Sequence, residues 1–435
     1  MALKLSVVGC GYLGATHAAC MSSLGFEVIG VDTDPEKIAL LSKGELPFYE
    51  PGLDSLLASE IKTGRLTFTT DFSAVADADV HFICVGTPQS KDGLAADLTY
   101  VKSAVAAIAP YLKKGSLVVG KSTVPVGTAQ GLRDQLAQSA PQSDLAWNPE
   151  FLREGFAVED TLTPNRLVVG VANDRAEDVL KEVYKPIIDL GTPWIRADLP
   201  TSELVKVAAN SFLATKISFI NAMAEVCEAA GGDVTVLAKA IGYDPRIGNR
   251  FLQAGIGFGG GCLPKDIRAF LARADELGLA ESLNFLKEFD LINQRARTRA
   301  VALALKELGN PKGKKIAVLG AAFKPDSDDV RDSPALEIAE TLHALGASVV
   351  VHDPRALESA AAKIPELTYS DSIEETLTQA DLTMHLTEWG EYRALDPALV
   401  KKLVKVPTIF DGRNVLDVAK WQNAGWKLLA LGRAL

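Results

Sequence analysis

The feature that most constrains the fold is a glycine-rich turn near the start of the chain, between a strand-length apolar run and a helical stretch. Residues 5–8 are followed by Gly9-x-Gly11-x-x-Gly14, and Asp32 ends the next apolar run about 20 residues further on. The first glycine permits a tight turn, the second lets the backbone approach a pyrophosphate, and the third lets the helix pack on the strand. The helix N-terminus would bind the phosphates, while Asp32 would accept from the ribose hydroxyls and repel a 2′-phosphate. This context predicts an NAD-binding domain, whereas the turn by itself would indicate only a tight bend.

Strand-length apolar runs alternate with helical stretches, which predicts βαβ units and parallel sheets. Further strands of the first series are expected at 27–31, 80–85, 117–119 and 167–170. Residues 202–230 contain almost no Gly or Pro and predict one long helix, and helical texture continues to about residue 309. A second series follows the loop at 310–315, because 316–320 resembles 5–9 and 349–354 resembles the run that ends at Asp32.

We therefore expect an α/β fold with two Rossmann-like parallel-sheet domains joined by a long central helix and a helical connector. The expected boundaries are 1–200 for the NAD-binding domain, 201–309 for the central helix and helical dimerisation region, and 310–435 for the second sheet domain. The turn of the second series, Gly320-Ala321-Ala322-Phe323-Lys324-Pro325, lacks the second and third glycines. The second domain could therefore hold another nucleotide or be purely structural.

The composition limits the kinds of partner. Of the 435 residues, 48% are hydrophobic, and the formal net charge is -10. An acidic surface repels phosphate backbones and anionic lipid, so neither nucleic acid nor a membrane is an expected partner. No apolar run reaches the ~18 residues needed to span a bilayer. The cysteines are scattered without CxxC spacing, which favours reduced thiols, a cytoplasmic location and no metal site; they are Cys10, Cys20, Cys84, Cys227 and Cys262.

The segment richest in potential chemistry is a glycine run that ends in a cysteine, Gly255-Ile256-Gly257-Phe258-Gly259-Gly260-Gly261-Cys262. So many glycines exclude a helix and indicate close approach of the backbone to another group. Pro264 is typical of the first turn of a helix, so Cys262 would lie at a helix N-terminus, where a thiolate is stabilised. Asp266 would follow one turn later and could face the same cavity. The other four cysteines are expected to be buried, whereas Cys262 is predicted to be a nucleophile that adds to an aldehyde beside NAD.

Two further pairs of polar residues share a helical spacing of four. Lys206 and Asn210 would lie on one face of the long helix and would be costly to bury without partners. Donors aimed at a developing oxyanion could stabilise a transition state by ~3–4 kcal/mol. Glu150 and Glu154 have the same spacing. On spacing alone, a solvated stripe is the competing interpretation of Lys206 and Asn210, and a functional role for Glu150 and Glu154 is the less favoured one.

Taken in order, these motifs resemble the UDP-glucose/GDP-mannose dehydrogenase family, and in particular its UDP-glucose 6-dehydrogenase branch, over the whole chain. The resemblance rests on the glycine turn, the Cys262 segment, and the runs Val85-Gly86-Thr87-Pro88, 121–127, 148–155, Glu203-Leu204-Val205-Lys206-x-x-x-Asn210, Phe323-Lys324-Pro325 and Asp329-Val330-Arg331. It implies an N-terminal NAD domain, a homodimer formed at the central helix, and a C-terminal domain for the UDP moiety. It also implies oxidation of UDP-glucose to UDP-glucuronate in two steps, through a thioester that water hydrolyses, with two NAD reduced per product.

The resemblance further implies roles for the residues at matching positions. Cys262 would be the nucleophile, Lys206 with Asn210 would stabilise the oxyanion, Asp266 with Thr123 would orient or activate water, and Glu150 would assist proton transfer. NAD would be contacted by Gly9, Gly11, Tyr12, Leu13, Gly14, Asp32, Lys37, Thr87, Thr123, Glu154, Lys265 and Arg331. The UDP-sugar would be contacted by Glu150, Phe151, Leu152, Arg153, Glu154, Lys206, Asn210, Phe251, Leu252, Gln253, Ala254, Gly255, Gly259, Phe323, Lys324 and Arg413, with Arg246 reaching the sugar site of the neighbouring subunit.

The chain departs from the commoner pattern of the family in two places. Gly261 stands where a serine often precedes the cysteine, and Phe258 stands where many members have tyrosine. Neither change removes a predicted catalytic group, but both bear on the substrate site. The alternative substrates are UDP-N-acetylmannosamine, UDP-N-acetylglucosamine and GDP-mannose. A β-hydroxyacid dehydrogenase would need no thiol, and a catalytically inactive sugar-nucleotide-binding protein would not need the full catalytic set.

Overall fold

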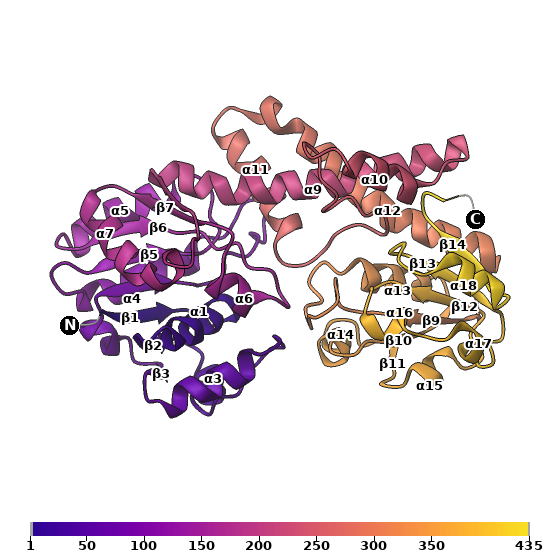
Figure 1. The fold of residues 1–435 in the computed structure, drawn as a ribbon, viewed down its shortest axis with the longest axis horizontal. Helices are drawn as coiled ribbons and strands as arrows, with labels where there is room; N and C mark the ends of the chain where they lie inside the picture. The colour runs from indigo at the N-terminus through magenta and orange to yellow at the C-terminus, as the bar shows by residue number, and fades with distance from the viewer. Residues whose placement is uncertain (1–2, 434–435) are drawn as a thin grey trace. The chain divides into compact units, whose positions relative to one another are not determined.

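A computed structural model describes residues 3–433 of the chain. The chain divides into two units, Met1–Ala209 with Arg268–Gly278, and Asn210–Ile267 with Leu279–Leu435. Each unit contains one sheet flanked by helices (Figure 1). The prediction of two parallel-sheet α/β domains and a long central helix is confirmed.

The first unit is built on an eight-stranded sheet with the order β3-β2-β1-β4-β5-β6-β7-β8. The pairings are parallel except that β6 and β7 run antiparallel, which the expectation of a parallel sheet did not include. The strands are β1 (Lys4–Val8), β2 (Glu27–Val31), β3 (Leu66–Thr69), β4 (Val80–Ile83), β5 (Leu117–Gly120), β6 (Asp144–Trp147), β7 (Leu167–Val171) and β8 (Trp194–Ala197). The helices are α1 (Tyr12–Ser23), α2 (Pro35–Ser42), α3 (Leu53–Lys62), α4 (Thr99–Ile108), α5 (Thr128–Ser139), α6 (Ala157–Leu162), α7 (Asp174–Val183) and α8 (Lys185–Ile188), with short 3₁₀ turns at Phe72–Asp77 and Ala109–Tyr111.

Both faces of this sheet are buried, which explains why its strands appear in the sequence as continuous apolar runs. Leu5 and Val7 belong to the core on the face covered by α1, α3 and α7. Val8 and Ile83 belong to the core on the opposite face, under α4 and α5. In the parallel register, Val8 pairs with Val31 and with Ile83, so the loops after β1, β2 and β4 emerge at one edge.

A single helix, α9 (Leu199–Ala230), runs for 32 residues where the sequence predicted a long helix at 202–230. Its first part belongs to the first unit and the remainder to the second. The connector that follows consists of α10 (Val234–Gly242), α11 (Leu263–Glu276), a 3₁₀ turn at Ala280–Leu283, and α12 (Asn284–Leu308). The second sheet then begins at Lys315, so the loop predicted at 310–315 is present.

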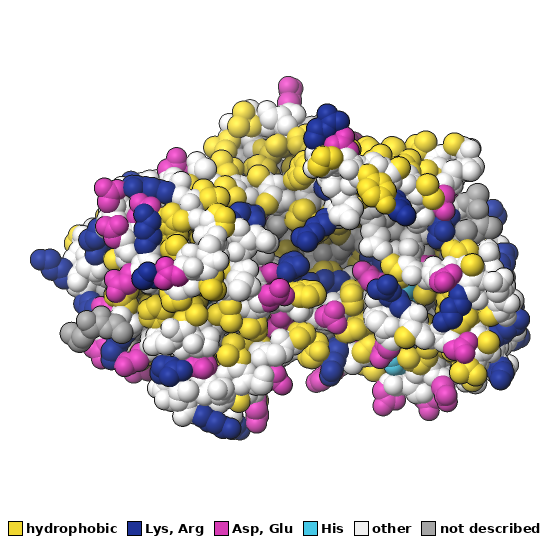
Figure 2. Space-filling view, viewed as in Figure 1, with side chains coloured by type: hydrophobic (Ala, Val, Ile, Leu, Met, Phe, Trp, Pro, Cys, Tyr) yellow, Lys and Arg dark blue, Asp and Glu magenta, His cyan; other side chains and the backbone are white. Residues whose placement is uncertain are grey.

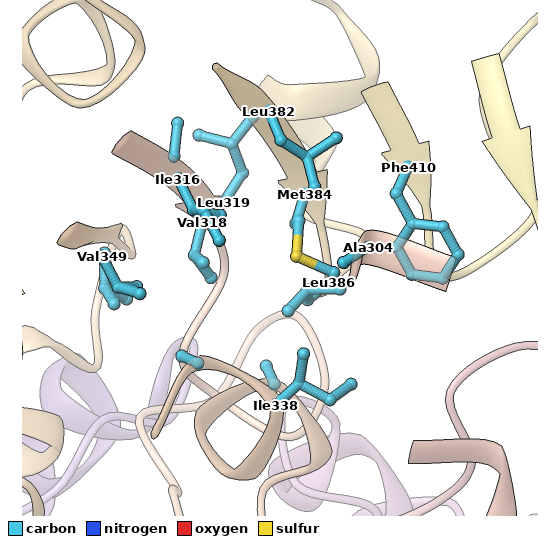
Figure 3. Close-up of a cluster of buried hydrophobic side chains, with 14 of the residues drawn as sticks. Ala304, Ile316, Val318, Leu319, Ile338, Val349, Leu382, Met384, Leu386 and Phe410 are labelled. Atoms are coloured by element: carbon cyan, nitrogen blue, oxygen red, sulfur yellow. The ribbon is translucent and has the colours of Figure 1, made fainter. Parts of the chain in front are cut away.

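The second unit contains a fully parallel six-stranded sheet with the order β11-β10-β9-β12-β13-β14, the same order as the first six strands of the other sheet. Its core joins the strand residues Ile316, Val318, Met384 and Phe410 to Ile338 of α13 (Figure 3). The strands are β9 (Lys315–Leu319), β10 (Ser348–His352), β11 (Thr368–Tyr369), β12 (Leu382–His385), β13 (Thr408–Asp411) and β14 (Lys427–Ala430). The helices are α13 (Pro334–Ala344), α14 (Leu357–Lys363), α15 (Ile373–Leu377), α16 (Gly390–Arg393), α17 (Pro397–Val400) and α18 (Val418–Asn423).

Acidic and basic side chains are interspersed on the face of the molecule that Figure 2 shows. With a net charge of -10, the binding of an anionic ligand must therefore depend on local donors and helix N-termini. Within residues 3–433, the structure contains no helix with the length and hydropathy required of a membrane span.

Candidate active site

The glycine turn after β1 has the geometry that the sequence predicted. Gly9 has a φ of 89°, and a Cβ at Gly14 would lie 1.8 Å from the Gly9 carbonyl oxygen, so neither position accepts a side chain. A Cβ at Gly11, by contrast, would meet no atom of the chain within 4 Å. Gly11 is also the N-cap of α1 and makes no side-chain cap to its first N–H groups. These features fit a pyrophosphate at the helix N-terminus.

Asp32 follows β2 at the same edge of the sheet. Its Oδ2 accepts from the backbone N of Cys10 at 2.7 Å and from Nζ of Lys37 at 2.9 Å. These bonds fix a carboxylate beside the glycine turn, where it can accept from ribose hydroxyls and repel a 2′-phosphate. The residues present therefore fit NAD. Lys37 was predicted to contact the same ligand, and the structure places it on Asp32.

A buried acid that the sequence analysis did not identify ties this turn to the segment containing Glu150 and Glu154. Glu50 is 3% exposed and accepts from the Tyr12 hydroxyl, from Gly155 N at 2.7 Å and from Ala157 N at 2.7 Å. One carboxylate thus holds the start of α1 and the start of α6. No local sequence signal marks Glu50, because its partners at 155 and 157 are more than 100 residues away.

In the first unit, Lys206 of α9 forms an ion pair with Glu150. The Nζ to Oε1 distance is 2.9 Å, and the side chains are 5% and 13% exposed. The other Glu150 oxygen accepts from Leu152 N at 2.6 Å, and the Phe151 ring lies 5.6 Å from Lys206 Nζ. A nearly dry Lys–Glu pair of this kind can stabilise negative charge on a reacting oxygen and pass a proton between its members. The solvated-stripe interpretation of Lys206 is therefore wrong.

The loop between β5 and α5, which contains Thr123, is held from two sides. Thr87 Oγ1 donates to the Thr123 carbonyl at 2.8 Å. Glu203, 2% exposed on α9, accepts from Gly127 N at 2.7 Å and Ala129 N at 2.6 Å. Glu203 thus caps the N-terminus of α5, and it lies three residues before Lys206 on α9. The sequence contained Glu203 within a family motif but gave it no role.

A buried lysine under this loop was also missed as a functional candidate. Lys121 Nζ lies 3.0 Å from Asn148 Oδ1 and 3.4 Å from the Tyr184 hydroxyl. Burial lowers the pKa of Lys121 to about 8, and the neighbouring Glu150 opposes that shift. This amine holds the end of β5 against β6 and places a titratable cation near the Lys206–Glu150 pair.

In the second unit, the glycine run before Cys262 packs against α12 and against the segment from Phe323 to Pro334. Side chains added to these glycines would overlap those neighbours. A Cβ at Gly257 would lie 2.3 Å from Asn293, and one at Gly259 would lie 2.1 Å from the Asp332 carbonyl oxygen. A Cβ at Gly260 would lie 2.8 Å from the Phe323 ring, and one at Gly261 would lie 2.3 Å from the Arg331 guanidinium carbon. The predicted close approach of the backbone is thus an approach to α12 and to the segment from Phe323 to Pro334.

Two residues of α12 that lie four positions apart, Asn293 and Arg297, form hydrogen bonds with the backbone of Phe258. Asn293 accepts from Phe258 N at 2.8 Å and donates to Phe258 O at 2.9 Å. The same carbonyl accepts from Arg297 Nη2 at 2.9 Å, and Arg297, 1% exposed, also pairs with Asp332 at 2.7 Å and with Glu337. The loop that precedes Cys262 is therefore rigidly held.

Cys262 is exposed and immediately precedes α11, whereas the other four cysteines are buried, as expected. Its carbonyl accepts from Asp266 N at 2.9 Å, so Asp266 lies one turn later, as the spacing predicted. The Asp266 carboxylate is 1% exposed and accepts from Asn210 at 2.6 Å and from Lys265 at 2.6 Å. Cys262 thus lies at a helix N-terminus, which favours a thiolate, and one turn before a buried carboxylate with two donors, which can order a water.

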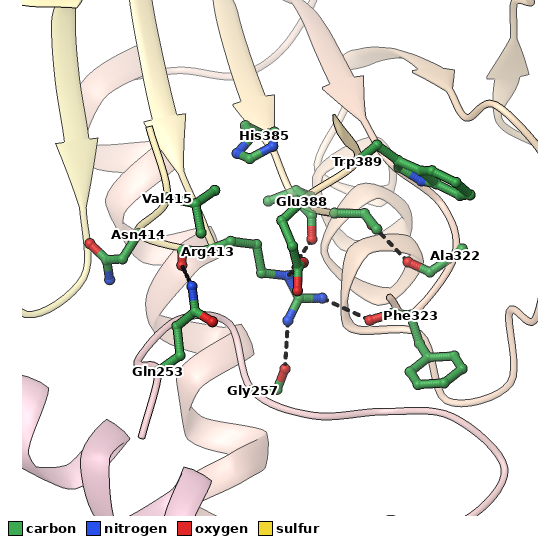
Figure 4. A network of polar contacts seen from close by, with 12 residues as sticks. Gln253, Gly257, Ala322, Phe323, His385, Glu388, Trp389, Arg413, Asn414 and Val415 are labelled. Carbon is green, nitrogen blue, oxygen red and sulfur yellow. Dashed lines mark hydrogen bonds and ion pairs between the residues drawn. The ribbon is translucent and has the colours of Figure 1, made fainter. Parts of the chain in front are cut away.

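Several residues predicted to contact the UDP-sugar converge on Arg413 (Figure 4). Its guanidinium donates to the carbonyls of Leu386 at 2.7 Å, Gly257 at 3.0 Å and Phe323 at 3.0 Å. The Arg413 carbonyl accepts from Gln253 Nε2 at 3.3 Å. Arg413 therefore connects the glycine run before Cys262 to the loops that follow β9 and β12. Leu252 and Ala254 are buried in the same unit, and Lys324 Nζ lies 5.6 Å from the Phe323 ring.

Two predicted contact residues pair with acids close to them in the sequence. Arg153 pairs with Asp160 at 2.6 Å, and Arg246, which is exposed, pairs with Asp244 at 2.6 Å. Of the predicted catalytic residues, the first unit contains Thr123, Glu150 and Lys206, and the second contains Asn210, Cys262 and Asp266. Their joint action stays a prediction.

Comparison with known proteins assigns the chain to a family along its length. The UDP-glucose/GDP-mannose dehydrogenase family matches through its NAD binding domain at residues 3–188, its central domain at 200–295 and its UDP binding domain at 317–418. The chain belongs to the UDP-glucose/GDP-mannose dehydrogenase family. Family membership confirms the resemblance and the prediction of NAD as cofactor.

Members of this family with high similarity include named enzymes and solved structures. UDP-glucose 6-dehydrogenase TuaD of Bacillus subtilis (strain 168) is 42% identical over 99% of this chain and 93% of its own length. UDP-glucose 6-dehydrogenase of Rhizobium meliloti (strain 1021) is 41% identical over 99% of this chain and 100% of its own. The structure of a UDP-glucose dehydrogenase from Pyrobaculum islandicum has a TM-score of 0.91 and 38% identity, covering 100% of this chain and 98% of that one. A UDP-D-ManNAc dehydrogenase from Pyrococcus horikoshii has a TM-score of 0.87 and 27% identity, covering 99% of each chain.

Proposed function

We propose that the chain oxidises the C6 alcohol of UDP-glucose to the carboxylate of UDP-glucuronate, with two NAD reduced per sugar. The observation that carries this proposal is the placement of Cys262 as the one exposed cysteine of the described chain, at the start of α11 and one helical turn before Asp266. Its relatives at 42% and 41% identity are named UDP-glucose 6-dehydrogenases, which supports this substrate.

NAD, when bound at the Gly9–Asp32 edge, supplies a hydride acceptor for each of the two oxidations. The Lys206–Glu150 pair takes up the proton of the C6 hydroxyl as the alcohol becomes an aldehyde. The Cys262 thiolate then adds to the aldehyde carbon, and Lys206 and Asn210 stabilise the oxygen that becomes negative. Loss of a second hydride from that carbon leaves a thioester on Cys262.

Water attacks the thioester carbon and the C–S bond breaks, which releases the carboxylate and restores the Cys262 thiolate. Asp266, with Thr123, orients that water and accepts its proton. The net reaction consumes one sugar nucleotide, one water and two NAD, and it yields the acid, two NADH and three protons. We propose the division into 1–200, 201–309 and 310–435 as the functional division of the chain, for NAD, subunit contact and UDP respectively.

We also propose a homodimer, with a second copy of the chain covering an apolar stripe of α9. Phe212, Phe219 and Val226 recur every seven residues and are 67%, 42% and 56% exposed. A stripe at this spacing lies along one side of a helix, and a two-fold axis would bring it against its own copy. Arg246, which is exposed and pairs with nearby Asp244, is proposed to reach the sugar site of that second copy. Within residues 3–433 no disulfide joins the five cysteines, which supports a cytoplasmic location.

The proposal is tested by NADH formation with UDP-glucose, UDP-N-acetylmannosamine, UDP-N-acetylglucosamine and GDP-mannose, together with the count of NADH per sugar consumed. We expect the highest kcat/KM with UDP-glucose and a count of two. Cys262→Ser should lower kcat by a factor on the order of 10³, while Cys20→Ala, which removes a buried thiol, should retain turnover. Full turnover by Cys262→Ala would refute the covalent route, and a higher kcat/KM with another sugar would overturn only the substrate.

A further inference from the structure

We infer that Arg331 electrostatically activates the Cys262 thiolate, and that Gly261 makes this possible. The inference rests on the proposed function in one respect, namely that Cys262 is the nucleophile. The geometry comes from the second unit alone, which contains both the glycine loop and the segment from Phe323 to Pro334.

The guanidinium of Arg331 lies against the backbone of the residue that precedes Cys262. A Cβ at Gly261 would be 2.3 Å from Arg331 Cζ, 2.5 Å from Nη1 and 2.7 Å from Nη2, so the whole planar head packs where a side chain would begin. The backbone is held as well, because Gly260 N donates to the Arg331 carbonyl at 2.9 Å. A serine at position 261 could not coexist with this arrangement.

The guanidinium is fixed in this position by a neighbouring carboxylate. Arg331 Nε lies 2.9 Å from Asp329 Oδ2, and Nη2 lies 2.6 Å from the same oxygen. The Arg331 side chain is 65% exposed, whereas that of Asp329 is 11% exposed. Nη1, the third nitrogen of the head, is the one that would lie 2.5 Å from a Cβ at Gly261. Nη1 is thus the nitrogen nearest to residue 261, and Nη2, which binds Asp329, lies almost as close.

Charged groups of this unit lie near Cys262 or the glycine run on α11, on α12 and in the segment after β9. In the first turn of α11, Lys265 and Asp266 form a pair at 2.6 Å, and Asn210 of α9 binds the second Asp266 oxygen without adding charge. In the segment after β9, Arg331 pairs with Asp329. At the Phe258 carbonyl, Arg297 of α12 pairs with Asp332 at 2.7 Å and with Glu337. The Lys265–Asp266 and Arg331–Asp329 pairs are each neutral, and among these charges the Arg331 head is the one that lies against residue 261. A cation there favours the thiolate over the thiol.

The test measures the reactivity of Cys262 in the full-length enzyme without NAD or sugar, which separates this role from any contact of Arg331 with NAD. The rate of iodoacetamide alkylation is followed from pH 6 to 9.5 by the mass of the peptide containing Cys262. We expect Arg331→Met to raise the apparent pKa of the thiol by about 0.5 to 1 unit, which slows alkylation at pH 7 about three- to tenfold. Arg331→Lys, which keeps the charge, should restore most of the rate.

Gly261→Ala provides an independent variant, because its Cβ must displace the end of a flexible and exposed side chain. Like Arg331→Met, Gly261→Ala should slow the alkylation of Cys262. Asp329→Asn removes the counterion and should speed it. Arg393→Met removes an exposed arginine of α16 and serves as the matched charge control, with no expected change. In 1 M salt, the gap between wild type and Arg331→Met should narrow, because exposed charges are screened.

Superposed pH profiles for wild type, Arg331→Met and Gly261→Ala would overturn the inference, as would an Arg331→Lys enzyme that reacts as slowly as Arg331→Met. Failure of the proposed function has a different signature. In that case the alkylation profiles would still shift, but Cys262→Ser would turn over UDP-glucose normally.

Discussion

Glu203 links α9 to the Thr123 loop through a carboxylate that is almost completely buried. The free energy of unfolding should therefore depend on whether this carboxylate is protonated. Burial raises the pKa of Glu203 from 4.5 to about 7, whereas the N–H groups of Ala129 and Gly127 and the charge of Arg273 oppose the shift. Because the folded-state pKa is above the unfolded value, the folded state binds the proton more tightly. The stabilisation is complete below about pH 4.5 and is lost as the pH rises through about 7.

The size of the effect follows from the difference between the two pKa values. Each unit corresponds to about 1.4 kcal/mol, so the free energy of unfolding should lose about 3 kcal/mol from this group between pH 4.5 and pH 7.5. The side chain in Glu203→Gln cannot ionise, so the variant lacks this pH-dependent contribution to the free energy of unfolding. It also gives up one of the two backbone N–H bonds, which is a loss of about 1–3 kcal/mol at every pH. The difference in unfolding free energy between variant and wild type should therefore shift in favour of the variant as the pH rises.

The assay is urea unfolding followed by far-UV circular dichroism at half-unit steps from pH 4 to 8.5. Glu182→Gln, at an exposed position of α7, is the matched control and should give a difference that does not vary with pH. A Glu203→Gln difference that is flat across this range would mean that the two N–H bonds and Arg273 cancel the cost of burial. A shift in the opposite direction would mean that they exceed it. Either result would refute the reasoning.

Four further predictions concern the site. Asp32→Ala should weaken NAD binding about tenfold or more, through the loss of charged hydrogen bonds to the ribose, and should narrow the preference over NADP, as measured by kcat/KM with each. Asp266→Asn should slow hydrolysis of the Cys262 thioester more than it slows the two oxidations, so that hydroxylamine traps the thioester. A variant that slows hydride transfer as much as hydrolysis would contradict the role assigned to Asp266. Mixing Arg246→Ala with Cys262→Ala chains should restore part of the activity if Arg246 acts across a dimer, and hybrid dimers without activity would count against that. Phe219→Lys should shift the light-scattering mass from dimer to monomer, whereas an unchanged mass would exclude the α9 stripe as the contact.

The elements that the sequence predicted are those whose determinants are local. Gly9 and Gly14 specify the first turn by themselves, since one needs a positive φ and the other a missing Cβ. The length of α9 follows from a run without Gly or Pro, and the position of Cys262 follows from Pro264 one residue inside α11. In each case the residues that decide the structure lie within one turn or one strand of the element, so spacing is sufficient to find them.

The residues that the sequence did not reveal act through long-range contacts. Glu50, Glu203 and Arg297 are buried charges whose partners lie 105, 76 and 35 residues away at Gly155, Gly127 and Asp332. Their signal in the sequence is an ordinary acid or arginine on a helix or loop. The glycine run before Cys262 showed that something approaches closely, but only the fold identifies that neighbour as α12 and the segment after β9.

The two sheets also explain why the sequence left the role of the second domain open. Asp353 follows β10 as Asp32 follows β2, and it likewise accepts from the backbone after the first strand, at Ala321 N and Ala322 N. In the second sheet, however, Trp389 Nε1 also donates to this carboxylate, at 3.2 Å, and Asp353 is 2% exposed. Asp353 is therefore less available to a ribose than Asp32, which is 8% exposed. The loops at this edge instead carry Phe323, Arg331 and Arg413, which hold the glycine run that leads to Cys262. A fold can thus keep its strand order after its fingerprint is lost, because the same strand ends that position a dinucleotide in one sheet can position a nucleophile in the other.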